Sequence, residues 1–387
     1  MDITALDHRY IANTYHRFPL QIVGGNGSIL YGADGREYID LGSGIAVNIF
    51  GINDEPWKQA VKAQLDAFQH CSNLYYSAPD AILAQMLCER TGMQKVFFSN
   101  SGAEANECAV KAARKWACEN KGEEYYHIIT LTNSFHGRTL GTLAATGQAV
   151  YHKDYHPLPS GFLHADVGDS DCIGQMLKQY PCAAIMIDIV QGEGGVMPIG
   201  YEFAQKLQSL CAVHDVLLIV DEVQLGNGRS GRLYGYMNYD LRPDIVSTAK
   251  GLGGGLPIGA TLLGEKVANT FGFSDHGTTF GGNPVSCAGA VNILSRIDET
   301  LLQGVCERSV LIQNELQDAE GILSVSGMGL MLGLELRKPA RQFAEQLLQN
   351  GVLVTTAKQK IRLLPALNIP IEQLKQAVQI IKDCAAK

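Results

Sequence analysis

Residues 217–224 read Leu-Leu-Ile-Val-Asp-Glu-Val-Gln, a short aliphatic run that ends at an acidic residue, Asp221. Continuous rather than alternating hydrophobicity is typical of a strand that is covered on both faces, as in a parallel sheet flanked by helices. In such sheets, ligands bind beyond the carboxyl ends of the strands. We therefore expect Asp221 to lie at the edge of the sheet where a binding site forms.

Other short apolar runs repeat this pattern, and helix-like stretches follow them, which predicts an α/β architecture. These runs are residues 96–98, 128–131, 184–187 and 245–247. Turn signals at 24–27 and 33–35 predict a small antiparallel element near the start of the chain. The segment after Pro284 predicts an α+β lobe, with a long helix, a strand at 330–336, a helix at 340–349, a strand at 352–354 and a final helix.

Composition excludes several classes of protein. The net charge of −8 is spread along 387 residues without basic runs, which disfavours nucleic-acid binding. The longest aliphatic strings are far shorter than the roughly 20 residues that span a bilayer, and the N-terminus has no signal-peptide pattern. The ten cysteines form neither a C-x-x-C pair nor a zinc-type spacing, so we expect a cytoplasmic protein with reduced thiols and no metal site.

Residues 245–255, Ile-Val-Ser-Thr-Ala-Lys-Gly-Leu-Gly-Gly-Gly, place Lys250 at the end of a predicted strand. Most lysines are solvated surface charges. Here the neighbours are apolar or small, and desolvation lowers the pKa of an amine, as a Schiff-base lysine requires. The glycine run could instead indicate a dinucleotide loop of an oxidoreductase, but Leu256 stands where the third glycine of that motif belongs.

Residues 97–107, Phe-Phe-Ser-Asn-Ser-Gly-Ala-Glu-Ala-Asn-Glu, end a strand and start a helix. Ser101 and Glu104 have the spacing of a capping box. Gly102 would let a phosphate approach the free N–H groups at the helix start. A well-capped helix without a ligand is the plain alternative.

The acid at the end of the first run, Asp221, also has more than one interpretation. It fits a helix cap, a metal ligand, or an acid that holds the positive charge of a cofactor's ring nitrogen.

Taken together, the motifs resemble those of class III aminotransferases of fold type I, and among them most closely the acetylornithine aminotransferases. The motifs occupy residues 13–19, 44–48, 99–107, 135–141, 191–195, 221–224, 249–251, 276–284 and 361–365. This resemblance implies a mainly parallel seven-stranded sheet in a large domain, residues 46–283, and a smaller α+β domain built from residues 1–45 and 284–387. It also implies the cofactor pyridoxal 5'-phosphate (PLP), bound by a homodimer.

The resemblance assigns roles to individual residues. Lys250 is the catalytic residue, which forms the Schiff base with PLP. The other implied cofactor contacts are Asp221 to the pyridinium nitrogen, Gln224 to the ring hydroxyl, Val223 and Phe135 on the two ring faces, Gly102 and Ala103 on the phosphate, and Thr279 contributed by the neighbouring subunit. The implied substrate contacts are Arg138 to the α-carboxylate, Glu193 and Arg362 as a masking pair for the second carboxylate of glutamate, and Tyr15 and Thr278.

The function implied is transfer of the terminal amino group of N-acetylornithine to 2-oxoglutarate, which yields glutamate, in arginine biosynthesis. Ornithine, succinylornithine and 4-aminobutyrate aminotransferases share the cofactor chemistry and remain alternatives, because the shape of the substrate pocket separates them. A non-catalytic protein that binds the cofactor is a further alternative.

Overall fold

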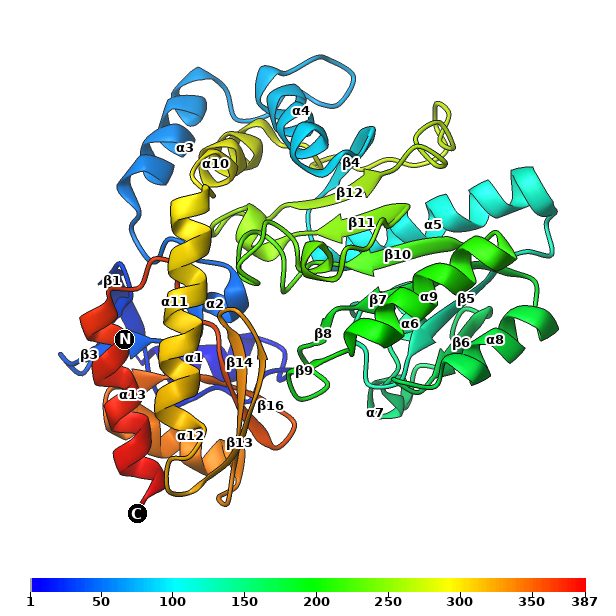
Figure 1. Cartoon of the computed structure of the whole chain (residues 1–387). Helices are drawn as coiled ribbons and strands as arrows, with labels where there is room; N and C mark the ends of the chain where they lie inside the picture. Colours follow the sequence, from blue (N-terminus) through cyan, green and yellow to red (C-terminus); the bar gives the residue numbers. More distant parts are fainter. Residues whose placement is uncertain (1) are drawn as a thin grey trace.

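The computed structural model describes residues 2–387, and a seven-stranded sheet forms its centre (Figure 1). In spatial order the strands are β4 (Lys95–Ser99), β12 (Gly259–Leu263), β11 (Ile245–Thr248), β10 (Leu217–Asp221), β7 (Cys182–Asp188), β5 (His127–Leu131) and β6 (Phe162–Ala165). Among these described strands, β12 alone runs antiparallel to its neighbours. The prediction of a mainly parallel sheet is confirmed.

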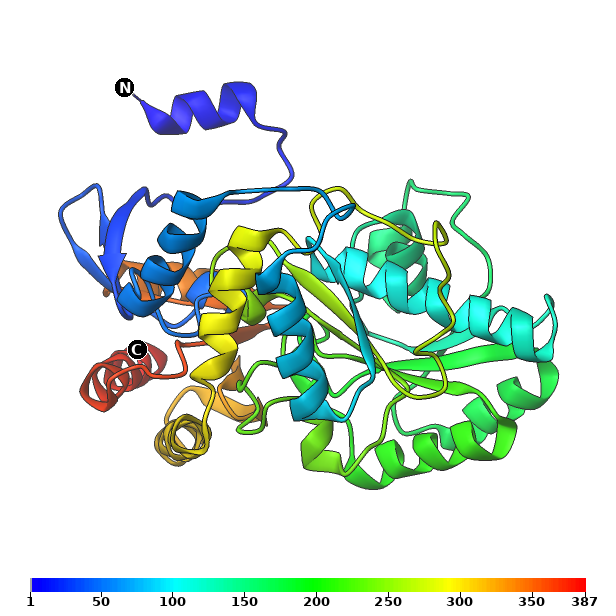
Figure 2. The same ribbon diagram turned by 90° about the horizontal axis from the view of Figure 1, so that it is seen from above.

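Helices cover both faces of this sheet, which explains why every residue of β7 and β10 is buried. The helix α5 (Gly102–Lys121) packs against one face, and α9 (Tyr201–His214), with α8 (Ser170–Gln179) beside it, packs against the other (Figure 2). The buried side of α5 is rich in alanine, so the helix can lie close to the strands. Its N-terminus therefore meets the carboxyl ends of the central strands.

The second region is assembled from both ends of the chain. One four-stranded sheet contains β1 (Ile22–Asn26), β2 (Ile29–Gly32), β3 (Glu37–Asp40) and β15 (Val352–Leu353). Another contains β13 (Ile322–Met328), β14 (Met331–Leu336), β17 (Lys360–Leu363) and β16 (Thr355–Ala357). The helices α11 (Glu299–Leu316), α12 (Ala340–Gln349) and α13 (Ile371–Ala385) complete the region, and β15 lies parallel to β3.

Further helices, turns and a strand pair complete the described fold. They are α1 (Ile3–Tyr10), α2 (Ser43–Ala46), α3 (Glu55–Ala67), α4 (Ala78–Thr91), α6 (Leu140–Ala145), α7 (Ala149–His152), α10 (Pro284–Ser295), the 3₁₀ turns η1 (Gly235–Tyr239) and η2 (Lys250–Leu252), and the strand pair β8 (Val190–Gln191) and β9 (Met197–Pro198). Within residues 2–387, none of the helices combines the length and the apolar character that crossing a membrane requires.

The predicted long helix after Pro284 is wrong, because the structure has two helices there, α10 and α11. The carboxylate of Asp298 accepts the N–H of Leu301 and so caps the second helix. The division of the chain at residues 46 and 284 stays a prediction. At this boundary α10 packs against α3 and α4, on the side of the large sheet (Figure 1).

Candidate cofactor and substrate site

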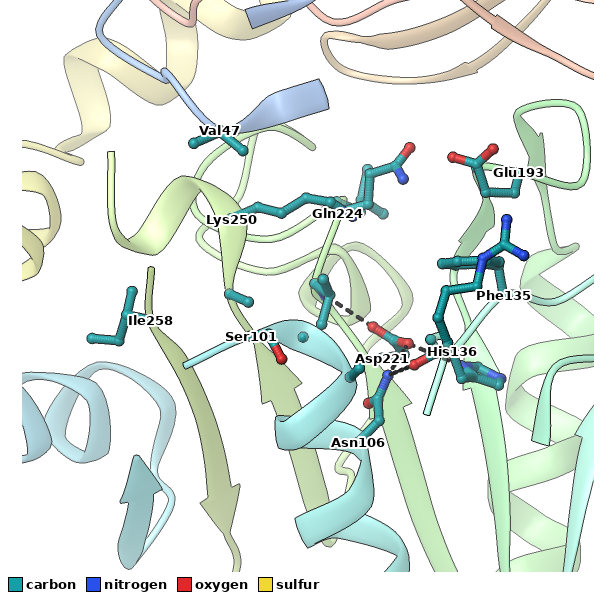
Figure 3. Close-up of a pocket in the computed structure, with 18 of the residues that line it drawn as sticks. Val47, Ser101, Asn106, Phe135, His136, Glu193, Asp221, Gln224, Lys250 and Ile258 are labelled. Carbon is teal, nitrogen blue, oxygen red and sulfur yellow. Dashed lines mark hydrogen bonds and ion pairs between the residues drawn. The ribbon is translucent and has the colours of Figure 1, made fainter. Parts of the chain in front are cut away.

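A cavity of about 620 Å³ opens at the carboxyl ends of the central strands. It is lined by seven of the predicted cofactor residues: Gly102, Ala103, Phe135, Asp221, Val223, Gln224 and Lys250. Tyr15, Arg138 and Glu193, predicted to contact substrate, also line it. Figure 3 shows side chains from the large sheet and from the loops around it converging on this cavity. Parallel strands bring their ends to one edge, which is why residues far apart in the sequence meet here.

Lys250 lies directly after β11, and its backbone has φ +44°, a left-handed conformation that is uncommon for a residue with a side chain. Within the described chain, its Nζ makes no hydrogen bond and no ion pair. Burial lowers the pKa of Lys250, against the opposing effect of the Asp221 carboxylate and with the help of the Arg362 charge. The cavity therefore holds a desolvated amine, as the sequence predicted.

The start of α5 supplies donors at the other side of the cavity. Ser101 caps the helix by accepting the N–H of Glu104 at 3.2 Å, and the Glu104 carboxylate reaches back to the N–H of Asn100 at 2.8 Å. The N–H groups of Gly102 and Ala103 precede that bond, in the turn where a helix has no acceptor of its own. An anion bound at this position would accept hydrogen bonds from both N–H groups.

Three donors hold the Asp221 carboxylate in place. Its Oδ2 accepts the side-chain N–H of Asn106 at 2.7 Å and the Nδ1–H of His136 at 2.9 Å, and its Oδ1 accepts the N–H of Val223 at 3.0 Å (Figure 3). Ser247 in turn donates to Asn106. The carboxylate is thus oriented toward the cavity by groups that are themselves fixed.

Electrostatics favour the charged form of His136. Burial alone would lower its pKa, but Asp188, 3.7 Å from Nδ1, and Asp221 together raise it. Burial raises the pKa of Asp188 to about 7, while His136 opposes that change. The three side chains are close enough to surround a cation. A cation would have to displace the two donors on Asp221 Oδ2, so we interpret the group as a hydrogen-bonded charge cluster.

Glu222, which follows Asp221 directly after the end of β10, is fully buried, and one of its oxygens accepts the N–H of Tyr236 at 2.7 Å. Burial raises its pKa to about 8. A second negative charge next to Asp221 is therefore largely absent at neutral pH.

The raised pKa of Glu222 predicts a pH-dependent stability. The folded chain keeps a proton that the unfolded chain releases near pH 4.5, the ordinary pKa of a glutamate, so this contribution is full below that pH and is lost as pH rises toward about 8. In Glu222→Gln it is absent, so the free energy of unfolding of the variant should rise relative to wild type between pH 5 and 8, by at most about 1.4 kcal/mol per pH unit, and its relative melting temperature should rise with it. A difference in melting temperature that stays constant across this range would contradict the assignment.

Glu193 and Arg362 are in direct contact across the two regions of the chain. Arg362, on β17, is almost fully buried and donates to Glu193 and, at 3.0 Å, to Oε1 of Gln224. Glu193 lies on the loop between β8 and β9, with glycines on both sides. The carboxylate thus covers the arginine from the cavity side.

Two further predicted substrate residues, Arg138 and Thr278, and the predicted cofactor residue Thr279 are less buried than Arg362. The Arg138 guanidinium lies 4.1 Å from the ring centre of Tyr151 and 5.6 Å from that of Phe135, at the cavity mouth. The Thr278 hydroxyl accepts a hydrogen bond from Asn100, and Thr279 is exposed. Thr278 and Thr279 do not line the cavity of their own chain.

Sequence reasoning missed the residues around Asp221: His136, Asn106, Asp188 and Ser247. A signal was present for Asp188, which ends β7 as Asp221 ends β10. Polar residues at such strand ends were expected to matter. Asn106 lies on a helix, and its role follows only from the packing of α5 on the sheet.

The fold and the site together define a class of protein. The profile of the family "Aminotransferase class-III" matches residues 10–385, and the chain belongs to this family. It is 45% identical over 381 residues to the acetylornithine aminotransferase of Haemophilus ducreyi, an alignment that covers 98% of this chain and 97% of the relative.

Two solved structures extend the comparison. An ornithine aminotransferase from Toxoplasma gondii superposes with a TM-score of 0.95 at 28% identity and covers 99% of this chain and 94% of the other. The N-acetylornithine aminotransferase from Stenotrophomonas maltophilia has a TM-score of 0.85 at 33% identity, with 99% and 98% covered.

Proposed function

We propose that this chain is a PLP-dependent aminotransferase that moves the terminal amino group of N-acetyl-L-ornithine to 2-oxoglutarate. The products are N-acetyl-L-glutamate 5-semialdehyde and L-glutamate, and the reaction serves arginine biosynthesis. The observation that carries the proposal is that Lys250 and Asp221 line one cavity in a chain that is 45% identical to an acetylornithine aminotransferase.

The residues of the cavity fit PLP. There is no room for a side chain at position 102, since a Cβ there would lie 2.5 Å from Cγ1 of Val223. Because Gly102 has no side chain, the backbone N–H groups stay accessible to a phosphate. We assign Asp221 to the ring nitrogen, Gln224 to the ring hydroxyl, and Phe135 and Val223 to the two ring faces. When bound, PLP serves as an electron sink for the carbon that loses a proton.

Side chains of the protein itself transfer protons and hold the charge of Asp221 in place. The lowered pKa of Lys250 lets its Nζ accept a proton from the substrate carbon that bears the amino group, and later return one. His136 and Asn106 keep the Asp221 carboxylate pointed into the cavity. Because a preorganised charge needs no rearrangement during the reaction, this arrangement lowers the barrier.

One cavity must accept two substrates of different charge. Arg138 would bind the carboxylate far from the reacting carbon, which is the α-carboxylate of N-acetylornithine and the side-chain carboxylate of glutamate, since a planar guanidinium can donate two parallel hydrogen bonds. Glu193 neutralises Arg362 while N-acetylornithine, with its single carboxylate, is bound. For glutamate or 2-oxoglutarate, Glu193 moves away on its glycine-flanked loop and Arg362 binds the second carboxylate.

The absence of a side chain at Gly102, at the assigned phosphate position, gives a direct prediction. In Gly102→Ala the new Cβ would push Val223 toward the ring, and overpacking of this kind typically costs about 1–3 kcal/mol. The dissociation constant for PLP should therefore rise about tenfold to a hundredfold, which fluorescence titration of the apoenzyme measures. Gly200→Ala is a matched control, because a Cβ at Gly200 meets no atom within 4 Å. Equal affinities for PLP in the two variants would count against the assignment of the phosphate to the N–H groups at Gly102.

The donor is tested by the visible spectrum of the purified protein before and after each amine is added. N-acetylornithine should discharge the cofactor band and 2-oxoglutarate should restore it. Steady-state kcat/KM should then rank N-acetylornithine above ornithine, succinylornithine and 4-aminobutyrate. Ornithine is the specific second candidate, because of the TM-score of 0.95 to an ornithine aminotransferase. A higher kcat/KM for ornithine would favour that function.

We further propose that the enzyme is a cytoplasmic homodimer in which Thr279 completes the partner's phosphate site. Two adjacent segments carry exposed apolar side chains that could form the dimer interface: Leu74, Tyr75, Tyr76, Phe273 and Phe280. The two segments are joined by Asn73, whose side chain donates to the carbonyls of Thr278 and Gly281. All ten cysteines are unpaired in the described chain, in keeping with a reducing compartment.

Mixed dimers test the shared site. Thr279→Ala and Lys250→Ala should each lower activity when purified alone. In a dimer formed from one chain of each variant, one of the two sites contains both Lys250 and Thr279, so activity should reappear on mixing after dissociation and reassociation. Absence of recovery, with mixed dimers verified by mass, would show that Thr279 does not act across subunits.

A further inference from the structure

Glu107 on α5 fastens the loop that carries Arg138. Its Oε1 accepts the hydroxyl of Thr139 at 2.5 Å and the backbone N–H of Thr142 at 3.1 Å. The hydroxyl groups of Thr139 and Thr142 lie 2.7 Å apart, which closes a three-residue network next to Arg138.

The local structure of α6 depends on this carboxylate. Thr139 is the N-cap residue of α6, but its side chain makes no capping bond to the helix. Glu107, from a different helix, accepts the N–H of Thr142 that a cap would otherwise satisfy. A Cβ at Gly141 would lie 2.5 Å from Oε2 of Glu107, so the glycine lets the carboxylate occupy this position.

Glu107 therefore connects two binding functions through one helix. The start of α5, at Gly102 and Ala103, lines the cavity at the assigned phosphate position, and Glu107 follows on the same helix. Arg138 has its guanidinium against the Tyr151 ring on α7, and the next residue, Thr139, is held from α5 by Glu107. A rigid connection of this kind fixes the distance between the cofactor and the arginine.

We propose that Glu107 is a positioning residue, which acts through Thr139 and Thr142 to hold Arg138 where it meets a carboxylate of each substrate. This inference rests on the proposed function of Arg138. Among the described residues, Glu107 is not one that lines the cavity, so its loss should weaken substrate binding through Arg138 and leave the cofactor in place.

The experiment compares holoenzymes carrying Glu107→Ala, Thr139→Ala, Thr139→Ser and Arg138→Ala. Glu119→Ala is the matched control, because Glu119 lies on the same helix and, among residues 2–387, pairs at the surface with Lys115 alone. In Glu107→Ala, KM for N-acetylornithine and for 2-oxoglutarate should both rise about tenfold, as loss of charge-assisted hydrogen bonds predicts. The kcat value and the PLP dissociation constant should change less than about threefold.

Conservative and double variants separate positioning from general stability. Thr139→Ser keeps the hydroxyl and should retain wild-type KM values, whereas Thr139→Ala should raise them. The double variant Glu107→Ala/Thr139→Ala should be no worse than Glu107→Ala, because both changes remove the same network. If Glu107→Ala does not fold, the comparison of Thr139→Ala with Thr139→Ser carries the test alone.

Several results would overturn the inference. KM values of Glu107→Ala equal to those of Glu119→Ala would show that Arg138 does not need the network. A rise in the PLP dissociation constant as large as the rise in KM would show that α5 is disturbed as a whole. If Arg138→Ala leaves KM unchanged, the proposed role of Arg138 fails and this inference with it; if only Glu107→Ala leaves KM unchanged, the inference alone fails.

Discussion

Replacing Lys250 by alanine is expected to lower the rate of transamination about a hundredfold to ten-thousandfold, because proton transfer by a positioned side chain contributes about 10² to 10⁴ in rate. The loss should appear in kcat for both half-reactions, since the same Nζ serves both. PLP should still bind, because the assigned phosphate and ring contacts come from other residues that line the cavity. Single-turnover kinetics with N-acetylornithine measure the effect.

A second lysine provides the control for Lys250. Lys266 follows β12 and lies 3.6 Å from Asp244 near the surface, away from the cavity. Lys266→Ala should retain the activity of the wild type. If Lys250→Ala retained activity within tenfold of the wild type while its PLP content was unchanged, the central assignment would be wrong.

Asp221→Asn should lower kcat about a hundredfold to a thousandfold, the range seen when one preorganised electrostatic contact is lost. The carboxylate now accepts three hydrogen bonds, at 2.7, 2.9 and 3.0 Å. An amide offers one acceptor oxygen, so its NH₂ group must face at least one of these donors. The variant therefore loses the negative charge and also the orientation of the side chain.

Asp221→Glu separates the two losses, because it keeps the charge and shifts it by one methylene. We expect its kcat to lie between those of Asp221→Asn and wild type. Rapid-mixing measurements of each half-reaction, together with PLP titration, give the comparison. An Asp221→Asn enzyme with wild-type kcat would mean that the ring nitrogen needs no carboxylate partner.

Much of the fold could be predicted because burial leaves a local mark on the sequence. The run from Leu217 to Val220 is continuous and apolar, and every one of these residues is buried in β10. The capping box at Ser101 and Glu104 is also a local pattern; its Ser101 bond forms as expected, whereas the Glu104 carboxylate accepts the N–H of Asn100 instead of that of Ser101. The break between α10 and α11 was missed, because the cap at Asp298 lies within an otherwise continuous helical pattern.

The site was predicted less completely because its contacts are long-range. The hydrogen bond between Asn106 and Asp221 spans 115 positions, and no spacing rule in the sequence points to it. β12 gave no usable signal, since Gly259–Leu263 is a short antiparallel strand inserted between β4 and β11. The roles of Arg138, Glu193 and Arg362 came from the resemblance alone, and the contact between the last two became visible only in the structure.

The pairing of β3 with β15 has a consequence for synthesis. The hydrogen bond from Arg36 to Gln349 spans 313 positions, so the first strands emerge long before their partners. At roughly 5 to 20 residues per second, a ribosome takes about 15 to 60 s to produce this stretch. During that time β1, β2 and β3 have an unpaired edge of the kind that invites wrong association. Arg362 arrives later still, so the nascent chain acquires its complete substrate pocket only as translation ends.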